Sequence, residues 1–222
     1  MYKGSSVNYY TSIQQNEAYK KHISSHNSSS TEPCTSRILG RRFALISTTY
    51  KYLDIGINVG LVSYVELRIG DNRGNQILLS YVMWKTLIEK HVDIEQLVQS
   101  IAPSSLSIHD LIIELVQMRN TNIVKFTLRD TCLYMKPSTI FFLFELEHCV
   151  EHVYYRFYEN IYGVSEKFKQ FINFLRRNCI TDKHIAIKTL RESNIFDKIS
   201  IIDCELLAYA IDNVVHYALH DQ

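Results

Sequence analysis

Two histidines four residues apart form the first pair in the sequence whose spacing suits chemistry. His148 and His152 lie in the stretch ELEHCVEH, and Glu145 precedes the first of them by three residues. On a helix, positions three and four apart share one face, which is how zinc ligands are often gathered. The stretch is not HExxH, because Cys149 follows the first histidine. An amphipathic helix with a polar outer face explains the same residues, so we expect no metal site and no cofactor.

A cysteine nucleophile is the second chemistry that the residue types allow. Nine histidines and five cysteines make chance pairing common, so a Cys–His pair is weak support for an enzyme. The sequence has no P-loop, no GxSxG and no paired-acid motif. With no CxxC pair and no signal peptide, the cysteines are expected to be free thiols in a reducing compartment. The sequence therefore predicts a protein that is not an enzyme and has no catalytic residues. The five cysteines are Cys34, Cys132, Cys149, Cys179 and Cys204.

The charge balance limits what the chain can bind. Its 24 Lys and Arg nearly cancel its 23 Asp and Glu, so no global positive field attracts nucleic acid, and any such binding must come from a local patch. A hydrophobic content of 46% in 222 residues supports a packed core. Apolar runs such as Thr139–Leu146 are far shorter than the roughly 20 residues that cross a bilayer, so no membrane contact is expected.

The elements that must position any functional side chain are expected to begin after a Ser-rich leader. Residues 1–40 carry few aliphatic side chains to offset the entropy of ordering, and are expected to form a mobile tail. From Arg41 onward, β-branched and partly alternating segments predict strands, separated by glycine-containing turns. The four strands are expected at 42–46, 52–59, 64–69 and 76–79.

A helix is expected directly after the fourth strand. Ser80 is a suitable N-cap, because its hydroxyl can accept a hydrogen bond from a first-turn amide. Trp84, Leu87 and Ile88 then recur with helical spacing, which continues to Val98. Four strands and a helix make a first unit, residues 41–100.

The same order of elements occurs a second time. Aligning residues 77–98 with 133–154 places Leu87 on Leu143 and Glu89 on Glu145. Before them, 111–118 and 123–128 are expected to form a hairpin with 119–122 at its turn. Aligning Leu67-Arg68 with Leu128-Arg129 leaves the second copy about five residues shorter at its loop. A second, more divergent sheet-plus-helix unit is therefore predicted at 101–162.

The last part of the chain reads as helical. Three segments have apolar spacing of about 3.6 residues and predict a helical extension over 163–222: 166–177, 183–192 and 203–220. The predicted fold class is α+β, with two four-stranded antiparallel sheet-plus-helix units in tandem, followed by this extension.

The strand-to-helix segment of the first unit carries a family pattern, I-x-L-[NS]-x-x-x-W-x-x-L-x-E-x-x-x-D-I. Phe43, Gly60 and Val65-Glu66-Leu67-Arg68 add a leading aromatic, a hairpin glycine and a strand end. On these residues, 41–100 resembles the DNA-binding domain of the transcriptional positive cofactor 4 family, and 101–160 resembles it more faintly. Two such units also resemble the whirly-type single-stranded nucleic-acid binders, whose helices hold the units together. The pattern positions are occupied by Ile77, Leu79, Ser80, Trp84, Leu87, Glu89, Asp93 and Ile94.

The resemblance implies binding of single-stranded DNA or RNA, with DNA favoured, in transcription or replication. It implies a nuclear location, homo-oligomers of two or more copies, and transcription or replication proteins as further partners. Arg68 and Arg129 are expected at equivalent places of the two units, facing either phosphate or a carboxylate such as Glu66. Trp84 is expected either to fill the core or to contact the ligand. The full set of expected contact residues is Arg41, Arg42, Lys51, Tyr64, Arg68, Arg73, Trp84, Lys125, Arg129 and Lys136.

The chain departs from the family at the first hairpin. Asn58, Val59 and Leu61 stand where the family has an aromatic residue and two lysines. This departure and the near-neutral charge favour a second hypothesis, a non-catalytic interaction or assembly module that keeps the fold without the nucleic-acid ridge. The many Ile, Tyr, Asn and Lys residues beside only 7 Gly and 3 Pro resemble the codon bias of an AT-rich genome, such as that of an insect virus or a protist. For a viral chain, the nucleus would be that of the host.

Overall fold

The computed structural model describes residues 36–100, 102 and 104–220. Of the predicted mobile tail, residues 1–40, the first 35 residues lie outside the described part. Its last five residues are the start of a strand, β1, which runs from Ser36 to Ala44. The strand therefore begins earlier than the sequence suggested, because Arg37 and Ile38 pair with the neighbouring strand and Ile38 is buried.

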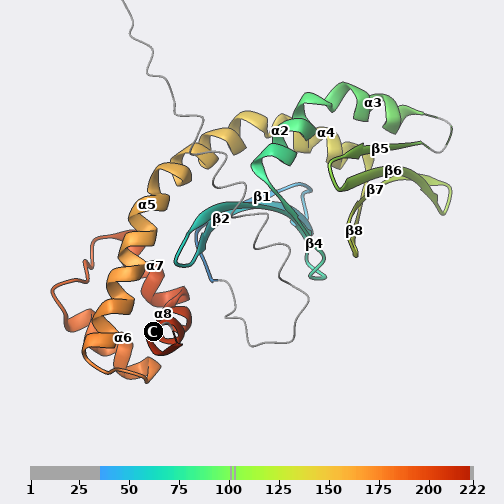
Figure 1. The fold of residues 1–222 in the computed structure, drawn as a ribbon. Coiled ribbons are helices and arrows are strands. Elements are labelled where there is room, and N and C mark those ends of the chain that lie inside the picture. Colours follow the sequence, from blue (N-terminus) through green and yellow to red (C-terminus); the bar gives the residue numbers. More distant parts are fainter. Residues whose placement is uncertain (1–35, 101, 103, 221–222) are drawn as a thin grey trace, which may run out of the picture. The chain divides into compact units, whose positions relative to one another are not determined.

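Two four-stranded antiparallel sheets form the β part of the protein (Figure 1). In each sheet the strands lie side by side in chain order, as a meander. The predicted α+β class, with two sheets each followed by helices and with helices at the C-terminal end, is confirmed. The first sheet contains β1, β2 (Lys51–Val59), β3 (Tyr64–Asp71) and β4 (Gln76–Leu79). The second contains β5 (Ser105–Ile108), β6 (Leu111–Met118), β7 (Thr121–Leu128) and β8 (Thr131–Met135).

Strand alternation gives the first sheet two different faces. In β2, Leu53, Ile55 and Ile57 are fully buried in the hydrophobic core, whereas Asp54 and the other even-numbered residues point to the opposite face. A bulge between Ile38 and Arg41 shifts the pairing of β1 by one residue, with Leu39 at a φ of 52°. The bulge puts Arg42 directly opposite Asp54.

The strand-to-helix signature folds as predicted at its start. Ser80 is the N-cap of α2 (Tyr81–Glu89), and its hydroxyl accepts a hydrogen bond of 3.1 Å from the amide of Met83. The expected single helix is instead two. Lys90 leaves helical geometry, and α3 (His91–Gln99) begins directly after it.

The second sheet is followed by two helices, the second of which is longer than predicted. Lys136 is the N-cap of α4 (Pro137–Glu145), with Pro137 in the first turn, where a missing N–H costs nothing. The next helix, α5 (Glu147–Arg177), has 31 residues. The expected boundary between the second unit and the helical extension, at residues 162 and 163, therefore lies inside one continuous helix.

Strand register corrects the expected equivalence of Arg68 and Arg129. Leu79 and Met135 both directly precede a helix N-cap, and they pair with Leu67 and Val124. Counting from these pairs, the counterpart of Arg68 is Lys125. Arg129 lies in the turn after β7, with a φ of 52°. The connection in the second copy is one residue shorter and not five, because the alignment had been anchored on a Leu-Arg match rather than on the strand pairing.

The two units share one hydrophobic core within the chain. Helix α3, from the first unit, contacts β5 and β6 of the second sheet, while α5, from the second unit, contacts β2 and β3 of the first. Strands β4 and β8 also touch. A single cluster of buried residues runs through both sheets and includes Trp84, Phe126, Leu133 and Leu143. The units therefore exchange helices, and neither sheet is covered by its own unit alone.

The C-terminal helices pack on the first sheet. They are α6 (Lys183–Glu192), as predicted, and α7 (Ile201–Tyr209) and α8 (Ile211–His220), where one helix was expected. Together with the second half of α5 they bury Ile38, Ile57 and Val59 in a second core. Across this contact, the amide of Leu39 donates to the Glu205 carboxylate. In the described part of the chain, no helix has both the length and the apolar character needed to cross a membrane.

Candidate nucleic-acid interface

The face of the first sheet turned away from the core is lined with charged side chains. We call it the polar face; it is formed by Arg37, Arg42, Tyr52, Asp54, Glu66 and Arg68. Its position follows from strand alternation and register: Asp54 and Arg68 each lie between two core residues of their strand, and Arg42 of β1 pairs with Asp54. Strand alternation, together with the bulge in β1, thus brings three of the chain's arginines to one side of one sheet.

Asp54 is at the centre of this face. Arg42 forms a two-point contact with its carboxylate, from Nε to Oδ1 at 2.8 Å and from Nη2 to Oδ2 at 2.6 Å. The Arg42 guanidinium also lies over the Tyr52 ring, 3.7 Å from its centre. The hydrogen bonds to Asp54 raise the pKa of Arg42, which stays charged. Arg42 is nonetheless half exposed. It is therefore a cation held in a fixed orientation at the surface.

Arg37 lies on the other side of Asp54. Its Nη1 is 3.4 Å from the Asp54 carboxylate, while its Nε and Nη2 are buried with no hydrogen-bond partner among the described residues. Burial lowers the pKa of Arg37, and Asp54 partly offsets that shift. The side chain fits there because residue 56 is glycine: a Cβ at Gly56 would come within 2.4 Å of Arg37 Nε. The guanidinium thus has hydrogen-bonding capacity that the described protein groups do not satisfy.

Glu66 holds the third arginine of the face. Arg68 donates from Nε to Glu66 Oε1, and Asn58 donates to the other carboxylate oxygen at 3.4 Å. Gln76 accepts from Arg68 at 3.3 Å and donates to the Tyr52 hydroxyl at 3.2 Å. Of the two roles that the sequence left open for Arg68, the structure shows the carboxylate pair. Asn58, one of the departures from the family pattern, is buried and orients Glu66.

Exposed cations lie on the edge strand β1 and at one end of the same sheet. The turn before β2 and the turn after β3 lie together, since the amide of Asn72 donates to the carbonyl of Tyr50 at 3.0 Å. Arg73 is exposed on the second turn, and exposed Arg41 lies 5.2 Å from the centre of the Phe43 ring. Arg41 and Arg73 are thus open to a ligand.

Lys51, expected to contact nucleic acid, is instead buried at this end of the sheet. Its Nζ is 2.9 Å from Asp71 Oδ2. Burial disfavours the Asp71 carboxylate, but hydrogen bonds from Lys51 and Asn75 outweigh it and lower the Asp71 pKa. Lys51 therefore stabilises the turn, and its inclusion among the contact residues is corrected.

Trp84 also belongs to the core. Its side chain has no exposed surface, and its Nε1 has no hydrogen-bond partner among the described residues. Its ring cannot stack on a base in this position, so the structure supports the packing role of the two that the sequence allowed. Tyr64 is partly buried on β3, and burial, with a smaller contribution from Glu66, raises its pKa to about 12. Its hydroxyl therefore stays protonated at neutral pH.

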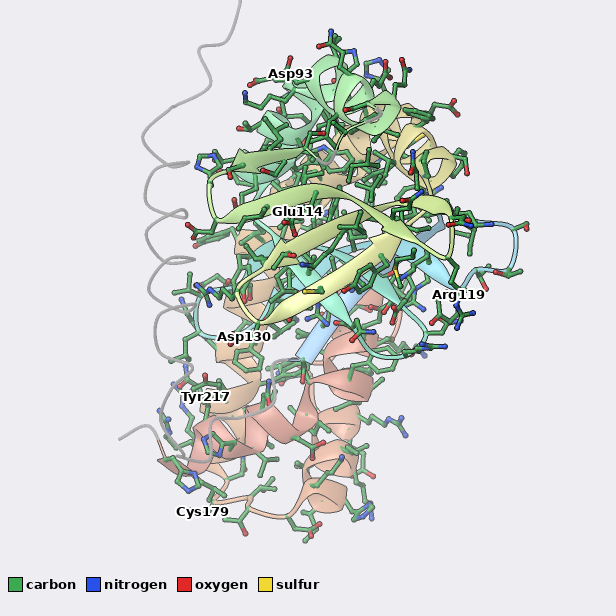
Figure 2. All side chains as sticks on the ribbon, turned by 90° about the vertical axis from the view of Figure 1, so that its right-hand side faces the viewer. Asp93, Glu114, Arg119, Asp130, Cys179 and Tyr217 are labelled. Atoms are coloured by element: carbon green, nitrogen blue, oxygen red, sulfur yellow. The ribbon has the colours of Figure 1, made fainter. Side chains whose placement is uncertain are left out.

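The second sheet places its candidate residues on a neutral surface. Lys125 pairs with Glu114 across the strands, with 3.0 Å between Nζ and Oε2. Figure 2 shows Glu114 on this sheet, with Arg119 and Asp130 in turns at its opposite ends. Arg129 is exposed in the same turn as Asp130, and Lys136 is exposed at the start of α4. Strands β5 to β8 and their turns contain three Lys and Arg and three Asp and Glu, whereas residues 36–79 contain six and three. Of the two sheets, the first is therefore the one with an excess of positive charge.

The sequence could not identify two of the residues that organise this interface. Arg37 was assigned to the tail because a bulge interrupts the strand pattern after it. Asp54 was read only as part of a strand, although an acidic residue in the middle of an apolar strand is a usable signal for a buried ion pair. The structure also changes the grouping of the candidate metal ligands. It brings His148 together with Glu147 and Glu151, whose possible ligand atoms lie within 4.8 Å of one another, rather than with Glu145 and His152.

Comparison with protein-family models, with curated proteins and with solved structures finds no match to this chain. What the fold and site define is therefore a structural class: a pair of antiparallel sheets fused through exchanged helices, with one basic polar face.

Proposed function

We propose that this protein binds single-stranded nucleic acid, preferentially DNA, along the first sheet, and that it does so in transcription or replication in a nucleus. The observation that carries the proposal is the local charge: residues 36–79 hold six Lys and Arg against three Asp and Glu, although the whole chain is almost neutral. A positive patch with aromatic rings beside it is the arrangement that follows a single strand. The proposal involves no catalytic step.

The cations of this sheet suit phosphate contacts of modest strength. Arg41 and Arg73 are exposed, and Arg42 is held by Asp54 with part of its guanidinium open. A fixed arginine loses less rotamer freedom on binding than a mobile one, but the carboxylate beneath it removes most of its net charge. Stacking of a base on an accessible ring contributes about 1 to 3 kcal/mol. We therefore expect micromolar rather than nanomolar binding at physiological salt.

The experiment is fluorescence anisotropy of a labelled 20-nucleotide oligo-dT, titrated with protein between 50 and 300 mM NaCl. Three phosphate contacts predict a slope of log K against log salt of roughly −2, because each contact to a single strand contributes about −0.7. Replacing both Arg41 and Arg73 by Gln should bring the slope to roughly −0.7. Arg119→Gln removes an exposed arginine from the neutral second sheet and should leave the slope unchanged. No binding by the unaltered protein at 50 mM NaCl, or an equal effect of Arg119→Gln, would overturn the proposal.

A second function, a non-catalytic assembly module, is favoured by a different observation. Asp54 and Glu66 neutralise Arg42 and Arg68, and the second sheet has no net charge. A surface whose charges are already paired suits contacts with other protein chains better than contacts with phosphate. Analytical ultracentrifugation distinguishes the two functions: a defined oligomer whose sedimentation does not change on addition of oligo-dT supports the module, and a shift on addition supports nucleic-acid binding.

A further inference from the structure

A row of tyrosines and glutamates runs along α5 beside its buried side, from Tyr154 at the edge of the core to exposed Tyr162. Tyr154, Tyr158, Tyr162 and Glu166 follow one another at intervals of four residues. Glu147, Glu151, Tyr155 and Glu159 form the row beside it with the same spacing. Positions four apart are neighbours on a helix surface, so phenol rings and carboxylates lie side by side in one stripe. We call these two rows, together with Tyr81 of α2, the Tyr–Glu face.

The rings of this face are held in place by one another. Tyr81 stacks on Tyr154 with 3.8 Å between ring centres, and Tyr154 is followed by Tyr158 at 6.1 Å. The Tyr81 hydroxyl donates to the Tyr155 hydroxyl at 3.2 Å. Tyr155 is nevertheless 55% exposed and Tyr162 is 77% exposed. Tyr155 is therefore both held in place and open to a partner, and Tyr162 adds a second exposed ring.

One cation of the protein already occupies this face. Lys85 reaches across from α2 and places its Nζ 2.6 Å from Glu151 Oε1. The hydrogen bond to Glu151 raises the pKa of Lys85, and Glu147 and Tyr155 add to the effect. The face thus holds an ammonium group against a carboxylate.

Two carboxylates further along α5 each follow an exposed tyrosine by four residues. Glu159 is exposed, follows Tyr155 by four residues and has no ion-pair partner within the described ranges. Glu166 follows Tyr162 by four residues, and its contact with Lys169 is on exposed surface. With a rise of about 1.5 Å per residue, Glu151, Glu159 and Glu166 are spaced about 11 to 12 Å apart along the helix axis. An extended peptide covers that distance in about three to four residues.

We infer that the Tyr–Glu face is a docking surface for a basic peptide segment of a partner protein, in which Lys or Arg recurs every three to four residues. Each cation lies over an exposed ring, Tyr155 or Tyr162, and pairs with the neighbouring carboxylate, Glu159 or Glu166. Ring quadrupoles and carboxylates both attract cations. Residues 147–166 carry four acidic side chains and one arginine. The net negative charge of this segment repels phosphate, so nucleic acid does not suit this face. The surface is therefore separate from the basic first sheet.

The test is a binding titration of the full chain with a fluorescein-labelled 13-residue peptide that has Lys at every fourth position and Ser and Gly between, at 50 mM NaCl. A peptide with Glu in place of Lys is the ligand control. Replacing Glu159 and Glu166 by Gln should weaken binding about two- to twentyfold, since each exposed ion pair changes affinity up to about fivefold. Tyr162→Leu should weaken it about two- to fivefold, and Tyr162→Phe, which keeps the ring, should not. Glu192→Gln, an exposed acid on α6, is the matched protein control.

Several outcomes would overturn the inference. They are no binding of the Lys peptide, equal binding of the Glu peptide, or equal loss with Glu192→Gln. Binding of oligo-dT that is lost in Tyr162→Leu would make the face a nucleic-acid surface instead. Self-association that disappears in the Glu159 and Glu166 double variant would make the occupant a second copy of the chain. The double Arg41 and Arg73 variant should bind the peptide normally, so failure of the nucleic-acid proposal is distinguishable from failure of this one.

Discussion

Replacing Phe126 in the second sheet by Ala is expected to destabilise the first sheet as much as the second. Phe126 is fully buried in β7, and it belongs to the same continuous cluster as Trp84 of α2. Removing a buried phenyl ring costs about 3 to 5 kcal/mol, a large part of the about 5 to 15 kcal/mol that stabilises a typical domain. Because the units exchange helices across this cluster, we expect the loss of stability to affect both sheets.

The chain supplies its own reporter for this prediction, since Trp84 is its only tryptophan. Urea unfolding is followed by Trp emission, which reports the α2 environment, and by far-ultraviolet circular dichroism, which reports all elements. For Phe126→Ala both midpoints should fall together. Ile112→Ala, on the half-exposed outer face of the same sheet, should shift them by less than about 1 kcal/mol. A Trp84 transition that stays at its original midpoint while the circular dichroism transition moves or splits would refute the shared core.

Three further perturbations test local features of the structure. Gly70→Ala should destabilise the protein by about 1 to 3 kcal/mol, because the new Cβ would come within 2.7 Å of the Tyr52 hydroxyl. Gly163→Ala on α5, where a Cβ meets nothing within 4 Å, should stabilise it by about 1 kcal/mol. The urea unfolding midpoints of the two variants, compared with that of the unaltered protein, test both predictions. Asp71 has a lowered pKa in the folded protein. Its stabilising contribution is therefore present above its unfolded pKa of about 4 and is lost as the pH falls through the folded pKa. Asp71→Asn should make the thermal midpoint decline less steeply between pH 5 and 2. Ser80→Ala removes the N-cap bond of α2 and should cost about 1 kcal/mol in urea unfolding, and no change would mean that the cap bond is not formed in solution.

Local chemistry made several elements predictable. Ser80 and Pro137 mark the starts of α2 and α4 by the hydrogen bonds they can or cannot make, and these signals need no knowledge of the fold. The break at Lys90 has no such signal, since neither Gly nor Pro occurs there. The 31-residue length of α5 was also missed, because the first half covers the shared core and the second half the C-terminal core, so its apolar pattern changes partner midway.

The candidate interface was less predictable than the fold, for a reason that lies in strand register. Alternation shows that Arg68 points away from the core, but not which side chains lie beside it. The pairing of Arg42 with Asp54 depends on the bulge in β1, and the match of Arg68 with Lys125 depends on the pairing of β4 and β8 with their neighbours. A sequence alignment of the two units contains neither the bulge nor the strand pairing. For this reason it matched Arg68 with Arg129.

The same limitation applies to the use of net charge. The near balance of 24 basic and 23 acidic residues indicated that any binding of nucleic acid must come from a local patch. Within that balance, residues 36–79 have three more basic than acidic side chains, and residues 147–166 have three more acidic than basic ones. Fields at distances beyond about 10 Å are largely screened at physiological salt, so a ligand at either surface responds to the local excess and not to the total. Whole-chain neutrality therefore does not exclude an anionic ligand on the first sheet and a cationic one on α5.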